Sequence, residues 1–165
     1  MLGEFIAKFS PAPVYISDPT WGNHFAIFGK CGLETRQYRY YDKSTNGFDF
    51  EGMCEDLKKA PVGSHILLHT CAHNPTGADP TLEQWKVIAD ICKEYKLKPF
   101  FDTAYQGFVT GDLDKDGASM RYFLDQGFQM IVAQSFAKIM GLYGERIGAL
   151  HIVCKDPDTA KKVES

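Results

Sequence analysis

The chain has 165 residues, of which 44% are hydrophobic and 24% are charged, a composition typical of a globular domain and not of a disordered or fibrous chain. Its formal net charge of -3 and its pI of about 5.9 give no reason to expect a nucleic-acid partner. No apolar run approaches the roughly 20 residues that a membrane-spanning helix requires.

Five widely spaced cysteines occur without any C-x-x-C pair. An odd number of cysteines without a secretory leader fits a reducing compartment and thiols that are free and mostly buried. The first ten residues lack the basic stretch, the long apolar stretch and the small-residue cleavage site of a signal peptide.

In the first half of the chain, short apolar runs alternate with segments of helical pattern. The expected elements are a strand at 14–16, a helix at 23–31, an aromatic strand at 38–41, a helix from Asp49 to about Lys59, and a strand at 65–70. Gly32 is expected to end the helix at 23–31, and Asp49 is expected to cap the helix that runs to about Lys59.

The second half continues the alternation. The expected elements are a helix from about Thr81 to Tyr95, strands at 99–101, 129–134 and 147–153, a helix at 119–126, a loop at 135–145, and a last helix that begins near Pro157 and breaks off at Ser165. Thr81 and Gln84 resemble a capping box displaced by one residue.

This alternation predicts an α/β fold with a mixed, mostly parallel sheet flanked by helices. In such sheets, ligands bind beyond the carboxyl ends of the strands. Polar residues gather at these predicted ends, namely His69, Asp102 and Ser135. The sequence therefore places the functional site at that edge of the sheet.

The segment from Ser135 to Arg146 has the strongest chemical signal. It holds Lys138 in an apolar, glycine-rich loop after a buried strand, where a lowered pKa would make the amine a good Schiff-base nucleophile. The Ser135 hydroxyl and the Arg146 guanidinium are both suited to a phosphate group. Taken alone, a lysine in a loop is more often a solvated surface residue.

Other segments supply groups suited to a flat, nitrogen-containing cofactor. A carboxylate at Asp102 can face the pyridinium nitrogen of pyridoxal 5′-phosphate (PLP), and Tyr105 can reach its phenolic oxygen. Asn74 lies in a tight turn, and Trp21 offers an aromatic plate beside the imidazole of His24. Taken alone, Asp102 could equally cap a turn, and an isolated Trp or His is more often a core residue.

Four segments, PTWGNH, CAHNPTG, FDTAYQGF and SFAKIMGLYGERIGA, resemble the active-site motifs of aspartate aminotransferases in their order and approximate spacing. The resemblance covers essentially the whole chain. The segments GFDF and GLYGER resemble the mitochondrial isoenzymes more than the cytosolic ones. It implies that residues 1–165 form the central part of the large PLP-binding domain. The N-terminal and C-terminal parts of the family fold, with a phosphate-binding loop and the substrate-binding arginines, would lie outside them.

The resemblance implies PLP as the cofactor, Lys138 as the catalytic lysine that forms a Schiff base with it and moves a proton at the substrate Cα, and no metal. The implied cofactor-binding residues are Trp21, Asn74, Asp102, Tyr105, Ser135, Lys138 and Arg146. Trp21 and Asn74 would also face the substrate carboxylate, and His24 and His69 would support Asp102. Two departures from the family pattern are Ile139, where Asn is usual, and Thr70, where Ala is common.

The implied reaction is amino transfer from L-aspartate to 2-oxoglutarate, giving oxaloacetate and L-glutamate. The implied setting is a homodimer in the mitochondrion, with the cytoplasm as the alternative, and without nucleic acid or a membrane span. A hypothesis of a different class is a truncated, catalytically inert chain that keeps the fold and acts at most as a binding module.

Three other motifs in the sequence partly match those of unrelated families. Ser135 and Lys138 match the Ser-x-x-Lys of penicillin-binding acyl transferases, but the accompanying S-D-N and K-T-G elements are missing from the sequence. The segment 112–117 copies half of an EF-hand loop, yet Phe123 stands where a bidentate Glu is needed, which favours a solvated acidic loop. His69 and His73 have the spacing of a helical zinc pair, but they fall in a strand and a loop.

Overall fold

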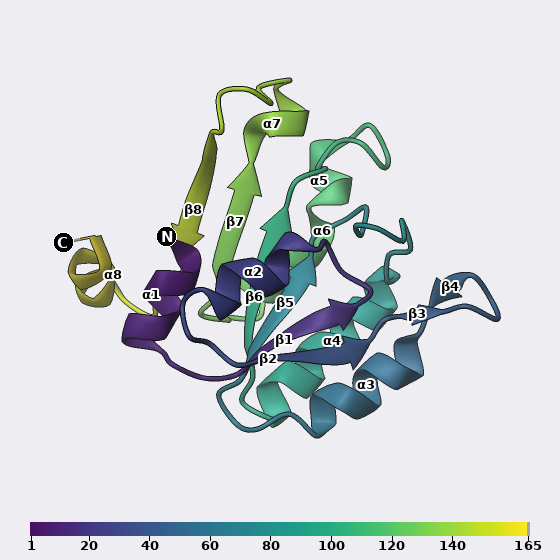
Figure 1. Cartoon of the computed structure of the whole chain (residues 1–165), viewed down its shortest axis with the longest axis horizontal. Helices are drawn as coiled ribbons and strands as arrows, with labels where there is room; N and C mark the ends of the chain where they lie inside the picture. Colours follow the sequence, from purple (N-terminus) through teal and green to yellow (C-terminus); the bar gives the residue numbers. More distant parts are fainter. Residues whose placement is uncertain (165) are drawn as a thin grey trace.

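The computed structural model describes residues 1–164, and a six-stranded sheet forms its centre, with the strand order β2-β1-β5-β6-β7-β8 (Figure 1). The strands are β1 (Val14–Asp18), β2 (Thr35–Arg39), β5 (His65–His69), β6 (Lys98–Thr103), β7 (Ile131–Ser135) and β8 (Gly148–Ile152). All neighbouring pairs are parallel except β7 and β8, which are antiparallel. The predicted mixed, mostly parallel sheet is therefore confirmed.

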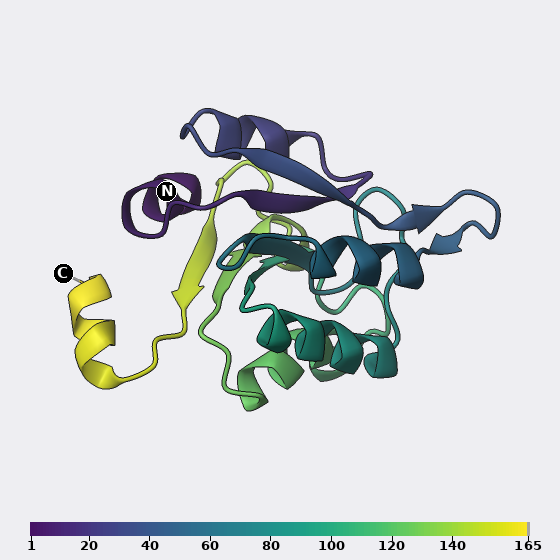
Figure 2. The same ribbon diagram turned by 90° about the horizontal axis from the view of Figure 1, so that it is seen from below.

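Helices cover both faces of this sheet (Figure 2). The described helices are α1 (Leu2–Phe9), α2 (Asn23–Gly29), α3 (Phe50–Lys58), α4 (Leu82–Glu94), α5 (Leu113–Asp116), α6 (Ala118–Asp125), α7 (Phe136–Ile139) and α8 (Pro157–Glu164), and a separate small sheet joins β3 (Tyr41–Asp42) to β4 (Gly47–Phe48). Helices α1 and α2 lie on one face, whereas α3, α4 and α6 lie on the other. None of the described helices is long and apolar enough to cross a membrane.

Alternation along the central strands explains the two helical layers. Ile66 and Leu68 of β5 pack into the larger core with α3, α4 and α6, whereas Leu67 between them packs into the smaller core with α1 and α2. In β6, Phe101 likewise packs into the larger core and Phe100 into the smaller one. Both faces of each strand are buried, which explains why these strands appear in the sequence as continuous apolar runs.

Hydrogen bonds confirm two of the expected helix starts, whereas the helix expected at 23–31 ends earlier, at Gly29, so Gly32 does not end it. The Asp49 carboxylate accepts the Gly52 N–H at 2.8 Å, as predicted for a cap of α3. Thr81 and Gln84 form a complete capping box in normal register, so the expected displacement of one residue was wrong. Because a capping box joins the N-cap to the third helical residue, α4 begins at Leu82.

Three helices were not expected from the sequence: α1, α5 and α7. The last two have four residues each, and α7 falls inside the segment 135–145 that was expected to be a loop. The acidic segment that contains α5 is not simply solvated either, because Asp116 is only 5% exposed. The five cysteines are all free, but only Cys54 and Cys92 are buried, so the expectation of mostly buried thiols was wrong for the other three.

Candidate active site

The carboxyl ends of β5, β6 and β7 meet at one edge of the sheet, as expected. His69, the last residue of β5, lies opposite Asp102 of β6, and Ser135 is the last residue of β7. A cavity of about 150 Å³ opens at this edge. Its lining residues are Trp21, His69, Cys71, Asn74, Asp102, Ala104, Tyr105, Ser135, Ala137, Lys138 and Arg146.

All residues that the sequence suggested for cofactor binding line this cavity, together with His69. His24 does not line it and instead lies behind Asp102, with which it hydrogen-bonds. Cys71, Ala104 and Ala137 also line the cavity but were not singled out. All three lie inside the quoted motif segments, so their position next to the proposed cofactor ligands was the signal that could have found them.

Lys138 enters the cavity from α7, whose first turn is fixed by Ser135. The Ser135 hydroxyl oxygen accepts the Ala137 N–H at 3.3 Å, which leaves the hydroxyl proton available to another acceptor. The Lys138 amine lies 5.2 Å from the centre of the Tyr105 ring and 5.9 Å from that of Tyr143. The amine carried by α7 therefore lies close to two aromatic rings.

Arg146 and Ser135 form an end of the cavity suited to an anion. Arg146 has a left-handed backbone with φ of 53°, just before β8, and donates to the Tyr143 carbonyl at 3.4 Å. A guanidinium carries five N–H donors, so this single contact leaves most of them for a ligand. Both residues were predicted to hold a phosphate, and both line the cavity.

Asp102 is held from behind by a chain of hydrogen bonds. His24 Nε2 lies 3.1 Å from Asp102 Oδ2, and His24 Nδ1 lies 2.7 Å from the Thr20 hydroxyl. Because an ionised carboxylate only accepts, Nε2 donates to Asp102 and Nδ1 can accept from Thr20. His24 is 3% exposed, so this chain orients the carboxylate from inside the protein. Thr20 was not expected to take part.

His69 stands on the other side of Asp102. Its Nδ1 accepts the Asn74 N–H at 3.1 Å, so the ring proton lies on Nε2, which is buried and has no hydrogen-bond partner among residues 1–164. Burial lowers the pKa of His69 to about 4, although the nearby Asp102 acts in the opposite direction and raises it. The ring is therefore neutral at pH 7.

Donor atoms of His24, His69 and Asp102 lie within 4.8 Å of one another, a grouping that could in principle hold a metal ion. We interpret it as a hydrogen-bonding network instead. His24 already donates to Asp102, and the nitrogen of His69 that is not bonded to Asn74 carries a proton. A metal ligand must offer a lone pair, which that protonated nitrogen does not have.

A stack of rings continues from His69 into the core. The His69 and His73 ring centres are 4.3 Å apart, and those of His73 and Tyr40 are 3.8 Å apart. Both nitrogens of His73 bond to hydroxyl groups, of Ser17 at 2.9 Å and of Thr76 at 2.8 Å. Burial and, to a smaller extent, the neighbouring imidazoles lower the pKa of His73 to about 2.

The buried imidazoles predict a loss of stability in mild acid. A histidine with a folded-state pKa below its unfolded value of 6.5 binds its proton only on unfolding, so stability is complete above pH 6.5 and falls as the pH drops toward 4. At about 1.4 kcal/mol for each pKa unit, His69 alone accounts for roughly 3 kcal/mol. Denaturant titrations at several pH values should therefore show a flatter pH dependence for His69→Asn. The surface variant His151→Asn is the control, and equal slopes for all three proteins would contradict the prediction.

Comparison with known proteins identifies the family. Residues 2–165 match the model of the family "Aminotransferase class I and II". The chain belongs to this family. It is 55% identical over 164 residues to the cytoplasmic aspartate aminotransferase of Oryza sativa subsp. japonica, covering 99% of the chain and 40% of the relative.

Two further relatives also match nearly the whole of this aminotransferase-family chain and a similar share of their own length. The mitochondrial aspartate aminotransferase of Xenopus tropicalis is 54% identical over 152 residues, covering 92% of the chain and 36% of the relative. The crystal structure of aspartate aminotransferase from Trypanosoma cruzi superposes with a TM-score of 0.95 at 50% identity, covering 98% of the chain and 42% of that protein. The chain thus spans about two fifths of the length of the aspartate aminotransferases that it matches.

Proposed function

We propose that residues 1–165 are the central part of the large PLP-binding domain of an aspartate aminotransferase, which transfers the amino group of L-aspartate to 2-oxoglutarate. The observation that carries the proposal is the convergence of Lys138, Asp102 and Arg146 on one cavity. An amine, a carboxylate and an anion-binding group are the three functions that PLP requires of its site. The names of the relatives support aspartate as the amino donor.

The residues around the cavity fit PLP group by group. Ser135 and Arg146 would hold the phosphate, and Asp102 would face the ring nitrogen. Tyr105 and Asn74 would bind the ring oxygen, and Trp21, which is 40% exposed, would cover the ring face. His69 also lines the cavity, and its buried Nε2 has no hydrogen-bond partner among the described residues, so an unsatisfied polar group lies at this site.

PLP, when bound, supplies an electron-accepting ring that stabilises negative charge at the substrate Cα. The protein's own contribution is positional. Lys138 would hold the cofactor and move the proton at Cα, with the Tyr105 ring beside its amine. His24 fixes the orientation of Asp102, whose carboxylate would face the ring nitrogen.

The partners and compartment follow from the same proposal. The substrates would be an amino acid and a 2-oxo acid, and the complete protein would act as a homodimer. A mitochondrial location is the expectation from the GFDF and GLYGER segments. Relatives named for the cytoplasm, the chloroplast and the mitochondrion match at 55%, 55% and 54% identity, so their names do not favour one compartment.

The second candidate function is an inert chain with the family fold. The helix α8 (Figure 2) favours it, because none of its described residues is buried. Thr159 and Val163 of this helix line an open cavity with Ser10 and His65 but are themselves only partly covered. A chain of this kind would at most bind PLP and would leave aspartate unchanged.

A trapping experiment separates these candidates. The purified chain is mixed with PLP, reduced with borohydride to fix any Schiff base, and digested for mass spectrometry. We expect the pyridoxyl group on Lys138, and a parallel assay with aspartate and 2-oxoglutarate reports turnover. Label on Lys138 without turnover would support the inert chain, and label spread over surface lysines would refute the cofactor site.

A further inference from the structure

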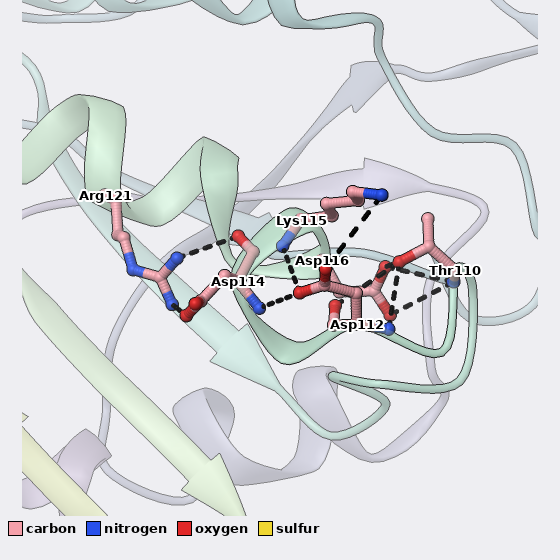
Figure 3. A network of polar contacts seen from close by, with 6 residues as sticks. All are labelled: Thr110, Asp112, Asp114, Lys115, Asp116 and Arg121. Atoms are coloured by element: carbon pink, nitrogen blue, oxygen red, sulfur yellow. Dashed lines mark hydrogen bonds and ion pairs between the residues drawn. The ribbon is translucent and has the colours of Figure 1, made fainter.

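The loop between β6 and α5 carries Tyr105 and is fastened by a carboxylate outside the cavity, that of Asp116. This carboxylate accepts the N–H groups of Gly107 at 2.8 Å, Val109 at 3.0 Å and Thr110 at 3.1 Å, and the Thr110 hydroxyl at 2.7 Å. Figure 3 shows the part of this network that joins Asp116 to Thr110. One side chain therefore holds the backbone of three loop residues.

The chemistry of this contact is that of an anion held by N–H groups. Asp116 is 5% exposed, and although burial alone would raise its pKa, the hydrogen bonds from Thr110, Val109 and Gly107 bring the pKa below its usual range. The carboxylate is therefore ionised at neutral pH, and its hydrogen bonds are charge-assisted. In this segment, which copies half of an EF-hand loop, the Asp116 carboxylate therefore binds backbone N–H groups and is not arranged to bind a calcium ion.

The neighbouring acids of the same segment have other tasks. Asp112 caps α5 by accepting the N–H groups of Asp114 and Lys115. The Asp114 side chain is 84% exposed and pairs with Arg121 at 2.6 Å (Figure 3). Among the described carboxylates of this acidic segment, Asp116 is the one that accepts hydrogen bonds from the loop residues 107–109.

The fastened turn reaches Tyr105 directly. Gly107, two residues after Tyr105, has φ of 91° and donates to Asp116, while the Phe108 N–H donates to the Tyr105 carbonyl at 2.9 Å. On its other side, Tyr105 follows β6, which is fixed in the sheet. The backbone of Tyr105 is therefore constrained from both directions, by the sheet and by the Asp116 turn.

We propose that Asp116 is a positioning residue of the active site, which acts through the turn 107–110 to hold the Tyr105 ring 5.2 Å from the Lys138 amine. The inference rests on the proposed function for the roles of Tyr105 and Lys138 with PLP. The mechanical link from Asp116 to Tyr105 does not depend on the cofactor. Loss of the link lets Tyr105 move away from the amine and changes the pKa at which the lysine-bound cofactor titrates.

Asp116→Asn tests the proposal, because it keeps the size of the side chain but replaces one acceptor oxygen by a donor that faces N–H groups. Asp114→Asn is the matched control, with the same change of charge two residues away on an exposed side chain. Thr110→Val is a milder variant that removes one hydroxyl donor and leaves the carboxylate, should Asp116→Asn fail to fold. Circular dichroism establishes that each variant is folded.

Two measurements need no cofactor. Amide hydrogen exchange should become about tenfold faster or more over residues 105–111 in Asp116→Asn and remain unchanged in Asp114→Asn. The ring signal of ¹³C-labelled Tyr105, assigned with Tyr105→Phe, should shift in Asp116→Asn. With PLP added, the pH midpoint of the visible absorbance should move in the same direction for Asp116→Asn and Tyr105→Phe.

The outcomes distinguish this proposal from the proposed function. If the parent chain shows no visible band with PLP but exchange and ring signal change as expected, the proposed function fails and the positioning role stands. If the band is present and Asp116→Asn behaves like Asp114→Asn, the positioning role is overturned and the proposed function stands. Faster exchange without a shift of the Tyr105 signal also overturns it, because Asp116 would then fasten the loop alone.

Discussion

Replacement of Lys138 by alanine is expected to abolish the visible absorbance band of the PLP-treated chain and to lower amino transfer by a factor of about a thousand or more. The amine lies in the cavity with Asp102, Tyr105 and Arg146, and no other lysine lines that cavity. Without it, PLP retains only its noncovalent contacts, and no side-chain amine remains to move the proton at Cα. Absorbance titration with PLP, followed by a coupled assay for oxaloacetate, measures both losses.

Lys155→Ala is the control for this substitution. Lys155 lies beyond β8, its side chain is 65% exposed, and its ion pair with Asp156 at 3.8 Å is of the surface kind that contributes little. The variant should keep the absorbance and any turnover of the parent chain. A visible band that survives in Lys138→Ala and is lost in Lys155→Ala would place the cofactor elsewhere.

Replacement of Phe123 by alanine is expected to lower the free energy of unfolding by about 3–5 kcal/mol, the usual cost of removing a fully buried phenyl ring. Phe123 on α6 is 0% exposed, and its ring centre lies 5.2 Å from that of Phe101 and 6.1 Å from that of Trp85. It thus joins α6 to both β6 and α4. Because a domain typically has only about 5–15 kcal/mol of stability, this change should be visible as a large drop of the urea midpoint.

The next residue provides the control. Leu124 lies on the same helix but is 46% exposed, so Leu124→Ala leaves the ring cluster intact. Its urea midpoint should stay close to that of the parent chain. Equal losses for Phe123→Ala and Leu124→Ala would contradict the prediction, because the cost would then not come from the buried ring cluster.

The sequence was informative where a segment is buried on both faces. Strands β5 and β6 lie in the middle of the sheet, and their apolar residues identified β5 to within one residue and the centre of β6. Helices α5 and α7 span barely one turn, too little for a period of 3.6 residues to appear in the pattern. Their positions depend on capping by Asp112 and Ser135, which have other possible partners in an unfolded chain.

The residues that line the candidate cavity could be suggested from the sequence, but only part of the contacts that support them could. Motif segments suggested Lys138 and Asp102, and the rule that ligands bind at the carboxyl ends of strands suggested that they would meet. The resemblance also suggested that His24 supports Asp102, and the two are hydrogen-bonded. The bonds from the Gly107 turn to Asp116 were not expected, because they join a side chain to backbone N–H groups of a preceding loop. Contacts of this kind depend on the tertiary structure and leave no local pattern.

The strand register of β5 and β6 has a consequence for motion. His69 and Asp102 face each other on two central strands, so the wall that they form can open only if the sheet itself separates. Lys138, by contrast, is carried by a helix of four residues, and short segments of this kind open locally at a small cost in free energy. We therefore expect one wall of the cavity to act as a fixed reference and the opposite wall to swing. Such a division would let the Lys138 amine change its position while Asp102 and His69 stay in place.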